Sequence, residues 1–278
     1  MSPLLMSATT LMQRPAGAGH LIFDCRYSLV DAGAGRRNYR HGHIPGAVYI
    51  DLADDLSQIS TLSQGRHPLP APSTLSQRFG AWGIGAGAQV TVYDDCSGMI
   101  AARLWWMLRY MQFDHVSLLD GGWQAWVDAG GPIEHGENEH APVVQFHGQP
   151  CRDRLVSIDA VEGARLLDAR DPRRYAGIEE PVDPVAGHIP GARNHCWQEN
   201  LDANGCFLSA QTLKSKLAAA LGATPDGHTT HYCGSGVSAC HNIFAQVLAG
   251  LPEPRLYCGS WSEWCRDRER QVMIIGNP

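Results

Sequence analysis

Short apolar runs alternate along this chain with longer stretches in which apolar residues recur every three or four positions. The short runs predict buried strands at 21–24, 48–50, 90–93, 116–119, 165–168, 229–232 and 255–257. The amphipathic stretches predict helices at 73–82, 100–111, 210–221 and 242–248, with Ser73 as a candidate N-cap. The polar residues 31–43 predict a loop. Because strands alternate with helices, we expect an α/β fold with a mainly parallel sheet.

Three sequence motifs occur twice, in the same order. His43-Ile44-Pro45-Gly46-Ala47 recurs from His188, an offset of 188 − 43 = 145. Asp24-Cys25-Arg26 is matched from Asp168, an offset of 168 − 24 = 144, and the stretch ending at Trp126 is matched by the one ending at Trp264, an offset of 264 − 126 = 138. Motifs repeated in order at a nearly constant offset indicate a duplicated domain.

The length of 278 residues is sufficient for two such domains, each with its own core. We predict two similar α/β domains, 1–130 and 151–278. Residues 131–150, rich in Gly, Pro, His and Glu, are predicted to be a linker between them.

The stretch from His231 to His241 carries the clearest chemical signal. A predicted strand leads into Cys233 and a loop with Gly234 and Gly236, and a predicted helix follows. Glycine lets such a loop turn its N–H groups inward, and the N–H groups and dipole at a helix start favour an anion. An anion at Cys233 is a thiolate, which is the reactive form of cysteine. We therefore predict a nucleophile at Cys233; the alternative is a buried structural cysteine.

Two other chemistries of cysteine loops are disfavoured here. A phosphatase loop of the Cys-x5-Arg type needs an arginine fork for the phosphate, but the sixth residue after Cys233 is Ala239. A redox Cys-x-x-Cys pair is also absent from the loop sequence. A sulfur atom carried on Cys233 itself fits a loop of this kind.

The segment Cys233-Gly234-Ser235-Gly236-Val237-Ser238-Ala239 resembles the active loop of the rhodanese superfamily, in the CGSGVTA form of 3-mercaptopyruvate sulfurtransferases. Thiosulfate sulfurtransferases usually carry a basic residue where this chain has Gly234. Ser238 replaces the usual Thr and keeps its hydroxyl. The resemblance covers essentially the whole chain and implies two rhodanese-like domains, of which 1–130 is catalytically silent and 151–278 is active.

The loop in the first copy supports that division. Aligning Tyr93 with Tyr232 puts Asp94 opposite Cys233, and a carboxylate cannot carry sulfur. Cys96 lies two residues further on; it is either a second reactive thiol or a shielded small residue.

For the substrate anion, Arg173-Arg174-Tyr175-Ala176-Gly177 is similar to the family pattern Gly-Arg-Phe/Tyr-x-Gly, which implies that Arg174 binds the donor and leaves Arg173 as surface charge. An arginine fork suits a carboxylate or thiosulfate equally. A second arginine of mercaptopyruvate enzymes is replaced by Asp183, as in thiosulfate-type enzymes. Arg103 is a further candidate, with a solvated or structural role as its alternative. The predicted substrate-binding set is completed by the loop residues Gly234, Gly236, Val237 and Ser238, whose amides face the anion.

For proton transfer, the resemblance implies a relay of a loop serine, a first-domain histidine and an upstream aspartate. The matching residues are Ser235, His43 and Asp31, which with Cys233 form the predicted catalytic set. The alternative for His43 is a structural turn histidine, because His188 occupies the same motif where no relay is expected.

Composition restricts the cellular location and the kinds of partner that we expect. The net charge of −6 argues against general affinity for nucleic acid, and nine cysteines without a C-x-x-C pair indicate a reducing, cytoplasmic location. The chain has no apolar run of about eighteen residues for a membrane span, no secretory signal pattern and no zinc-finger spacing. We expect no metal and no organic cofactor.

The prediction is thus a sulfurtransferase that moves sulfur from 3-mercaptopyruvate through a Cys233 persulfide to thioredoxin, a low-molecular thiol or cyanide. One alternative is a thiosulfate:cyanide sulfurtransferase, which Asp183 favours and Gly234 opposes. Another is a non-catalytic persulfide relay. The preferred donor, the acceptor and the oligomeric state stay open at this point.

Overall fold

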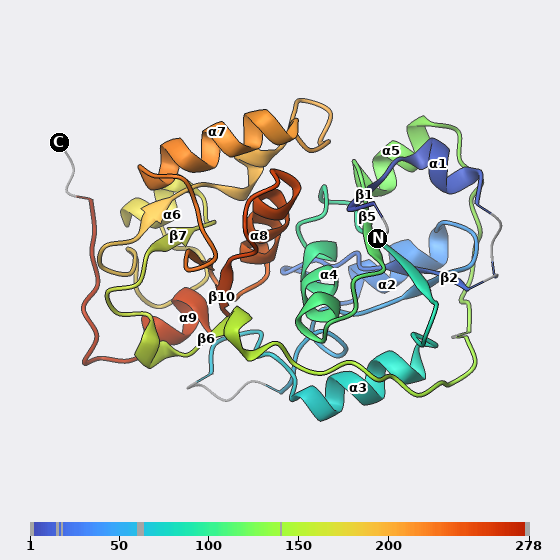
Figure 1. Ribbon diagram of the computed structural model, residues 1–278, viewed down its shortest axis with the longest axis horizontal. Helices are drawn as coiled ribbons and strands as arrows, with labels where there is room; N and C mark the ends of the chain where they lie inside the picture. The colour runs from blue at the N-terminus through green and yellow to red at the C-terminus, as the bar shows by residue number, and fades with distance from the viewer. Residues whose placement is uncertain (1–2, 15–16, 18, 60–63, 140, 276–278) are drawn as a thin grey trace. The chain divides into compact units, whose positions relative to one another are not determined.

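The computed structural model describes residues 3–14, 17, 19–59, 64–139 and 141–275 (Figure 1). The chain divides into two compact units. Unit 1 comprises Met1–Leu56, Pro70–Cys151 and Ala203–Cys206, and unit 2 comprises Ser57–Leu69, Arg152–Asp202 and Phe207–Pro278. Within the described residues, none of the helices combines the length and apolarity needed to cross a bilayer.

Unit 1 contains a five-stranded sheet in the order β1-β5-β4-β2-β3, with every pairing between these strands parallel. The strands in that order are Leu5–Met6, Val116–Leu119, Gln89–Tyr93, His20–Asp24 and Ala47–Tyr49. The helices of the unit are α1 (Ala8–Met12), α2 (Ala34–His41), α3 (Pro72–Ala81), α4 (Ala101–Tyr110) and α5 (Gly122–Asp128).

Unit 2 repeats the arrangement as β6-β10-β9-β7-β8, again with parallel pairings between neighbouring strands. These strands are Leu155–Val156, Arg255–Tyr257, Thr230–Tyr232, Leu166–Asp168 and Arg193–Asn194. Its α-helices are α6 (Pro172–Ala176), α7 (Ala210–Leu221), α8 (Ser238–Leu248) and α9 (Ser260–Trp264), and its 3-10 turns are Arg152–Arg154, Ile158–Ala160 and Trp197–Asn200. The predicted pair of similar α/β domains with mainly parallel sheets is confirmed.

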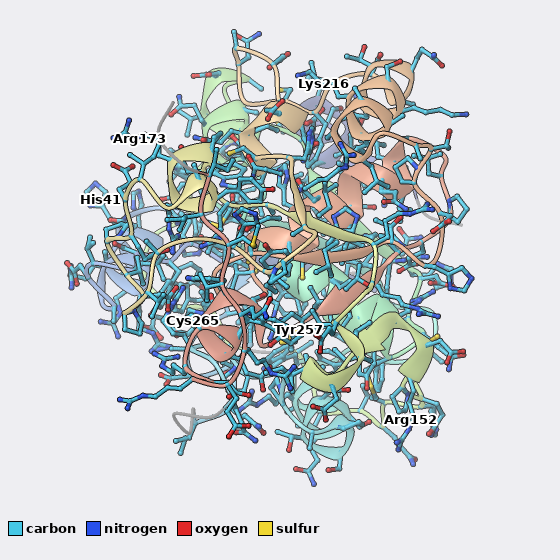
Figure 2. The ribbon with its side chains drawn as sticks, turned by 90° about the vertical axis from the view of Figure 1, so that its left-hand side faces the viewer. His41, Arg152, Arg173, Lys216, Tyr257 and Cys265 are labelled. Carbon is cyan, nitrogen blue, oxygen red and sulfur yellow. The ribbon has the colours of Figure 1, made fainter. Side chains whose placement is uncertain are left out.

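The longest helix of unit 2, α7, buries one face because its apolar residues have amphipathic spacing. Leu213, Leu217 and Leu221 of α7 recur every four residues and are buried, so they cover one face of the helix. Lys216 lies on the outer face (Figure 2) and pairs with Glu199. Ser209 caps the helix through the amide of Thr212.

Three local predictions were wrong. The segment 31–43 contains the helix α2, in which Tyr39 is the one large buried side chain, so its polar composition concealed the helical period. Helix α3 begins at Pro72 with Ala71 as its N-cap, because proline suits the first helical turn and displaces Ser73 from the capping position. Helix α8 begins at Ser238 rather than at Asn242.

The same polar lock stabilises both units. Arg26 bonds both oxygens of Asp24 and the carbonyl of Gly42, and Arg170 bonds both oxygens of Asp168 and the carbonyl of Gly187. Each guanidinium also lies over a tryptophan ring, at 4.7 Å for Trp123 and 4.8 Å for Trp261. The repeated motifs therefore hold the carboxyl end of each sheet and the helix start beside it.

Two parts of the chain do not follow the domain boundaries predicted from the sequence. Residues predicted as a linker pack on unit 1, where Val144 bonds the carbonyl of Gly80 and Phe146 meets Phe79 edge-on at 5.1 Å. Residues 57–69, although they lie within the first repeat, belong to unit 2. This segment brings Arg66 and His67 to the loop that carries Cys233.

Candidate active site

The loop after β9 places a cysteine sulfur on a backbone amide. Gly236 has φ +75°, and a Cβ there would collide with the carbonyl oxygen of Cys258, so only glycine fits. In this conformation the N–H of Gly236 donates to Sγ of Cys233 at 3.1 Å. Helix α8 starts two residues later, so its positive end favours a charged sulfur. Cys233 is 2% exposed but sits against polar groups rather than hydrocarbon alone.

Residues of helix α9 form further hydrogen bonds with the backbone of this loop. The N–H of Trp261 bonds the carbonyl of Cys233 at 3.0 Å, and the N–H of Ser262 bonds the carbonyl of Gly234 at 2.9 Å. The N–H of Cys233 donates to Oγ of Ser260 at 3.1 Å. Ser260 is buried with φ 55°, a conformation that costs a non-glycine residue energy. The Ser260 hydroxyl thus orients the cysteine backbone at the expense of local strain.

Ser235 meets a histidine that sequence reasoning did not select. Nδ1 of His67 lies 2.8 Å from Oγ of Ser235, and both residues are buried. The carbonyl of His67 accepts from Sγ of Cys258 at 3.7 Å, and the preceding amide, that of Arg66, donates to Oγ of Ser262 at 3.1 Å. Two residues after Cys233, the loop therefore has a hydroxyl–imidazole pair suited to proton transfer.

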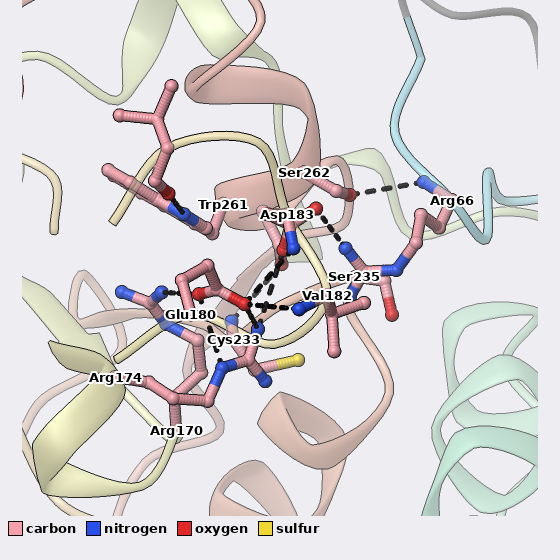
Figure 3. A network of polar contacts seen from close by, with 12 residues as sticks. Arg66, Arg170, Arg174, Glu180, Val182, Asp183, Cys233, Ser235, Trp261 and Ser262 are labelled. Atoms are coloured by element: carbon pink, nitrogen blue, oxygen red, sulfur yellow. Dashed lines mark hydrogen bonds and ion pairs between the residues drawn. The ribbon is translucent and has the colours of Figure 1, made fainter. Parts of the chain in front are cut away.

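Two guanidinium groups lie beside the residue that follows the cysteine. A Cβ on Gly234 would come within 2.8 Å of Nη2 of Arg66 and within 3.6 Å of Nη2 of Arg174. Glycine at this position therefore leaves room for both arginines. Both contact the buried carboxylate of Asp183, Arg66 through Nη1 and Arg174 through Nη2 at 3.4 Å (Figure 3).

Glu180 holds Arg174 in place. Its two oxygens accept from Nη2 and Nε of Arg174 at 2.6 and 3.2 Å, a bidentate arrangement. Burial by itself raises the pKa of Glu180, but the hydrogen bond from Arg174 and the neighbouring backbone amides outweigh it and lower that pKa. Arg173 is 60% exposed and pairs with Glu179. Arg174 and Arg173 thus differ in surroundings, and only Arg174 contacts the groups around the loop.

Comparison with known proteins identifies the family of this chain. The model of the rhodanese-like domain matches residues 7–129 and 153–267. The chain belongs to the rhodanese family. It is 44% identical over 98% of its length to the probable 3-mercaptopyruvate sulfurtransferase of Pseudomonas aeruginosa, of which it also covers 98%. It is 40% identical over 92% of its length to the putative thiosulfate sulfurtransferase SseB of Mycobacterium tuberculosis, with 92% of that protein covered.

Among solved structures, 3-mercaptopyruvate sulfurtransferase from Leishmania major superposes with a TM-score of 0.86 and 31% identity. The match covers 97% of this chain and 76% of that protein. The tandem architecture of this rhodanese is thus found in a protein named as a sulfurtransferase.

The corresponding loop of unit 1 has a carboxylate, that of Asp94, at the position of Cys233. The buried carboxylate of Asp94 accepts four backbone N–H groups at 2.7–2.9 Å, from Cys96, Gly98, Ile100 and Ala101. The N–H of Trp123 bonds the carbonyl of Asp94 at 2.8 Å, as that of Trp261 does for Cys233. In unit 1 the residue corresponding to Ser260 is Gly122, with φ 57°. This copy of the loop binds a carboxylate, which supports an anionic group at Cys233 in the other copy.

Cys96 lies in that occupied loop. Burial and the carboxylates of Asp94 and Asp95 raise its pKa well above the usual thiol range. This favours Cys96 as a shielded small residue over Cys96 as a second reactive thiol.

The other predicted relay residues are engaged within unit 1. Nδ1 of His43 lies 2.8 Å from the carbonyl of Tyr39, whose ring stacks on the imidazole at 4.0 Å. His188 has the same relation to Tyr175, at 2.8 and 3.9 Å. The repetition supports the structural alternative for His43. Asp31 is half-exposed and pairs with Arg37.

Arg103 and the remaining loop residues complete the predicted set. Arg103 is fully buried on α4, with Nη2 3.5 Å from the carbonyl of Leu56, which favours a structural role. Val237 is the N-cap of α8 and Ser238 is its first residue. The residues that sequence reasoning missed, Arg66 and His67, carried one weak signal: the segment between β3 and α3 spans 50–71, whereas its counterpart before α7 spans only 195–209.

Proposed function

We propose that this rhodanese is a sulfurtransferase that takes sulfur from 3-mercaptopyruvate onto Cys233 and passes it to a thiol or to cyanide. The observation that carries the proposal is the grouping around one sulfur atom of an amide donor, a Ser235–His67 pair and two arginines. Relatives named as 3-mercaptopyruvate sulfurtransferases support the choice of donor.

In the first half-reaction the donor carboxylate binds Arg66 and Arg174, which offer planar forks for it. The Cys233 thiolate attacks the donor sulfur, an S–S bond forms, and the C–S bond breaks with its electron pair going to carbon. The resulting enolate takes a proton and leaves as pyruvate. Ser235 donates a hydrogen bond to the developing enolate oxygen, and His67 holds or supplies the proton of that hydroxyl.

In the second half-reaction an acceptor thiolate attacks the outer sulfur of the persulfide. The S–S bond breaks, the acceptor leaves as a persulfide, and Cys233 returns to the thiolate. Cyanide reacts in the same way and leaves as thiocyanate. The amide of Gly236 supports the negative charge on Sγ of Cys233 in the thiolate that begins and ends each cycle.

The test is intact-protein mass spectrometry after incubation with 3-mercaptopyruvate. We expect the mass of one added sulfur atom, no adduct on Cys233→Ser, and an unchanged adduct on the matched control Cys96→Ser. Pyruvate release should match the adduct in amount. An adduct that persists in Cys233→Ser would contradict the proposal.

A second candidate is thiosulfate:cyanide sulfurtransferase, favoured by Asp183 and by the relative named as a putative thiosulfate sulfurtransferase. Initial rates on the two donors, read as thiocyanate, separate the two candidates. If neither donor loads Cys233 but a cysteine desulfurase does, the protein is a persulfide relay. We place any of these activities in the cytoplasm, with thioredoxin or a low-molecular thiol as acceptor.

A further inference from the structure

Cys258 follows the strand next to the one that leads into Cys233. Strands β9 and β10 pair in parallel, with His231 opposite Leu256. The offset of 256 − 231 = 25 equals 258 − 233, and each cysteine is the first residue after its strand. Neighbouring strands lie about 4.8 Å apart. The register therefore sets the two cysteine backbones within the separation that a disulfide spans.

Hydrogen bonds hold the two strand ends together past the last pair. The N–H of Cys233 donates to Oγ of Ser260 at 3.1 Å, and that hydroxyl donates to the carbonyl of Tyr257 at 2.9 Å. The loop also folds onto Cys258, since a Cβ on Gly236 would come within 3.1 Å of the Cys258 Cα. The N–H of the same glycine donates to Sγ of Cys233. Gly236 thus contacts both the Cys233 sulfur and the Cys258 backbone.

The thiol of Cys258 lies on the side of the Ser235–His67 pair. Its Sγ donates to the carbonyl of His67 at 3.7 Å, and Nδ1 of His67 lies 2.8 Å from Oγ of Ser235. Both Cys233 and Cys258 are buried. A thiol from solution has to enter the site to reach a buried sulfur, whereas Cys258 already lies there. A group held in place in this way reacts at a high effective concentration.

The two cysteines occur together in the active repeat and are both replaced in the silent one. The matching positions of unit 1 hold Asp94 and Asp120. They have the same relation in register, because Val92 lies opposite Leu118 and the offset of 118 − 92 = 26 equals 120 − 94. A carboxylate can neither carry sulfur nor form a disulfide. Unit 2 therefore has a second thiol at the position next to its nucleophile, where unit 1 has a second carboxylate.

We propose that Cys258 is a resolving thiol, which releases the outer sulfur of the Cys233 persulfide as hydrogen sulfide when no external acceptor is present. The inference rests on the proposed function, which supplies the persulfide. It adds an internal route by which the loaded site is emptied.

In this step Sγ of Cys258 attacks the inner sulfur of the persulfide and forms an S–S bond with it. The bond between the inner and outer sulfur atoms breaks, and its electron pair leaves with the outer sulfur. The proton of the Cys258 thiol goes to that sulfur, which departs as HS⁻. The Cys258 sulfur is oxidised to the extent that the outer sulfur is reduced, so no further oxidant is needed. A dithiol reduces the resulting disulfide by thiol–disulfide exchange, is itself oxidised to a disulfide, and restores both cysteines.

The test follows sulfide release from protein that has been loaded once. The protein is loaded briefly with 3-mercaptopyruvate, excess donor is removed by gel filtration because it is itself a thiol, and no acceptor is added. We expect the wild type to release one sulfide for each adduct. Its mass should change from one added sulfur atom, present at first, to the loss of two hydrogen atoms.

Cys258→Ser should keep the sulfur adduct and release sulfide at least about 100-fold more slowly, because it lacks the positioned nucleophile. The matched control is Cys240→Ser. Cys240 is buried on α8, and its Sγ donates to the carbonyl of Gly236 at 3.3 Å. This control should release sulfide as the wild type does. Release that is lost in Cys240→Ser and kept in Cys258→Ser would overturn the proposal.

Peptide mapping identifies the product directly. After alkylation of the remaining thiols, the wild type should yield the Cys233 and Cys258 peptides joined by a disulfide, which dithiothreitol separates. Cys258→Asp, which introduces the residue of the first repeat, serves if the serine variant does not fold. An adduct that persists in the wild type, or a disulfide that omits Cys258, would overturn this inference alone. A wild type that forms no adduct with the donor would overturn the proposed function as well, so the two failures are distinguishable.

Discussion

Nδ1 of His67 lies 2.8 Å from Oγ of Ser235, although 168 residues separate the two in sequence. The contact links the segment 57–69 to the loop that carries Cys233. It gives the proposed reaction a hydroxyl whose proton has a partner, which a serine alone in a loop does not have.

Removing either member of the Ser235–His67 pair should slow mercaptopyruvate turnover. We expect Ser235→Ala and His67→Gln each to lower kcat by roughly 10²-fold, the usual scale for lost general acid–base assistance. The double variant should be little worse than either single one, because the two residues act together. Steady-state pyruvate release measures this. Thiosulfate turnover serves as the control, since its leaving group has no enolate oxygen, and additive losses would argue against a functional pair.

Removing one of the two arginines should weaken donor binding more than it slows chemistry. Loss of a charge-assisted hydrogen bond costs about 1.5–3 kcal/mol, so Arg66→Ala and Arg174→Ala should raise KM for mercaptopyruvate by roughly 10- to 100-fold. Arg174→Lys keeps the charge but loses the fork that faces Glu180, and should recover only part of the loss. Arg173→Ala is the surface control. An effect of Arg173→Ala as large as that of Arg174→Ala would refute the assignment.

Asp94 should stabilise unit 1 through its four amide contacts. In Asp94→Ala these buried donors lose their acceptor, and at about 1–3 kcal/mol for each unsatisfied group we expect a loss of at least about 3 kcal/mol in the free energy of unfolding. Urea denaturation measures this loss in the free energy of unfolding. Asp95→Ala, a substitution of the exposed residue next to Asp94, is the control. Sulfate should raise the melting temperature of Asp94→Ala more than that of the wild type, because the vacated amides form an anion site. Equal stability of Asp94→Ala and the wild type would contradict this account.

His231 should make the protein sensitive to acid. Burial lowers its pKa from 6.5 to about 4, while the bond from Nε2 to Gln246 at 2.9 Å only partly opposes this. Between these two pH values the unfolded chain binds a proton that the folded chain excludes. Unfolding free energy should therefore fall as pH drops from 6.5 to about 4, by about 3 kcal/mol from this group.

The measurement is denaturant unfolding at pH 7, 6 and 5 in the wild type and in His231→Gln. The variant should show a flatter dependence on pH in this window. His228, exposed in the turn before β9, provides the control substitution. Parallel pH profiles for the wild type and His231→Gln would exclude His231 as the source.

The fold was accessible from the sequence because its signals are local or repeated. Apolar runs predicted seven of the ten strands that the described residues form, whereas the two-residue strands β1, β6 and β8 carried too little pattern. Helix α2 was missed because a polar helix with one buried tyrosine has no apolar stripe. The Cys233 loop was predicted because glycines beside a cysteine at a helix start have a chemical meaning, whereas Arg174 was selected from the resemblance of its segment to the family pattern.

By itself, the sequence determined that two α/β units of one ancestry carry one cysteine loop and one carboxylate loop. Only the tertiary structure decided which histidine meets Ser235 and which arginine joins Arg174, because His67 and Arg66 come from the segment 57–69, which lies in the first repeat of the sequence but belongs to unit 2. It also decided that Asp183 faces both arginines instead of solvent. Spacing along a chain sets which side chains share a local element, whereas contacts between distant segments depend on how the whole chain packs.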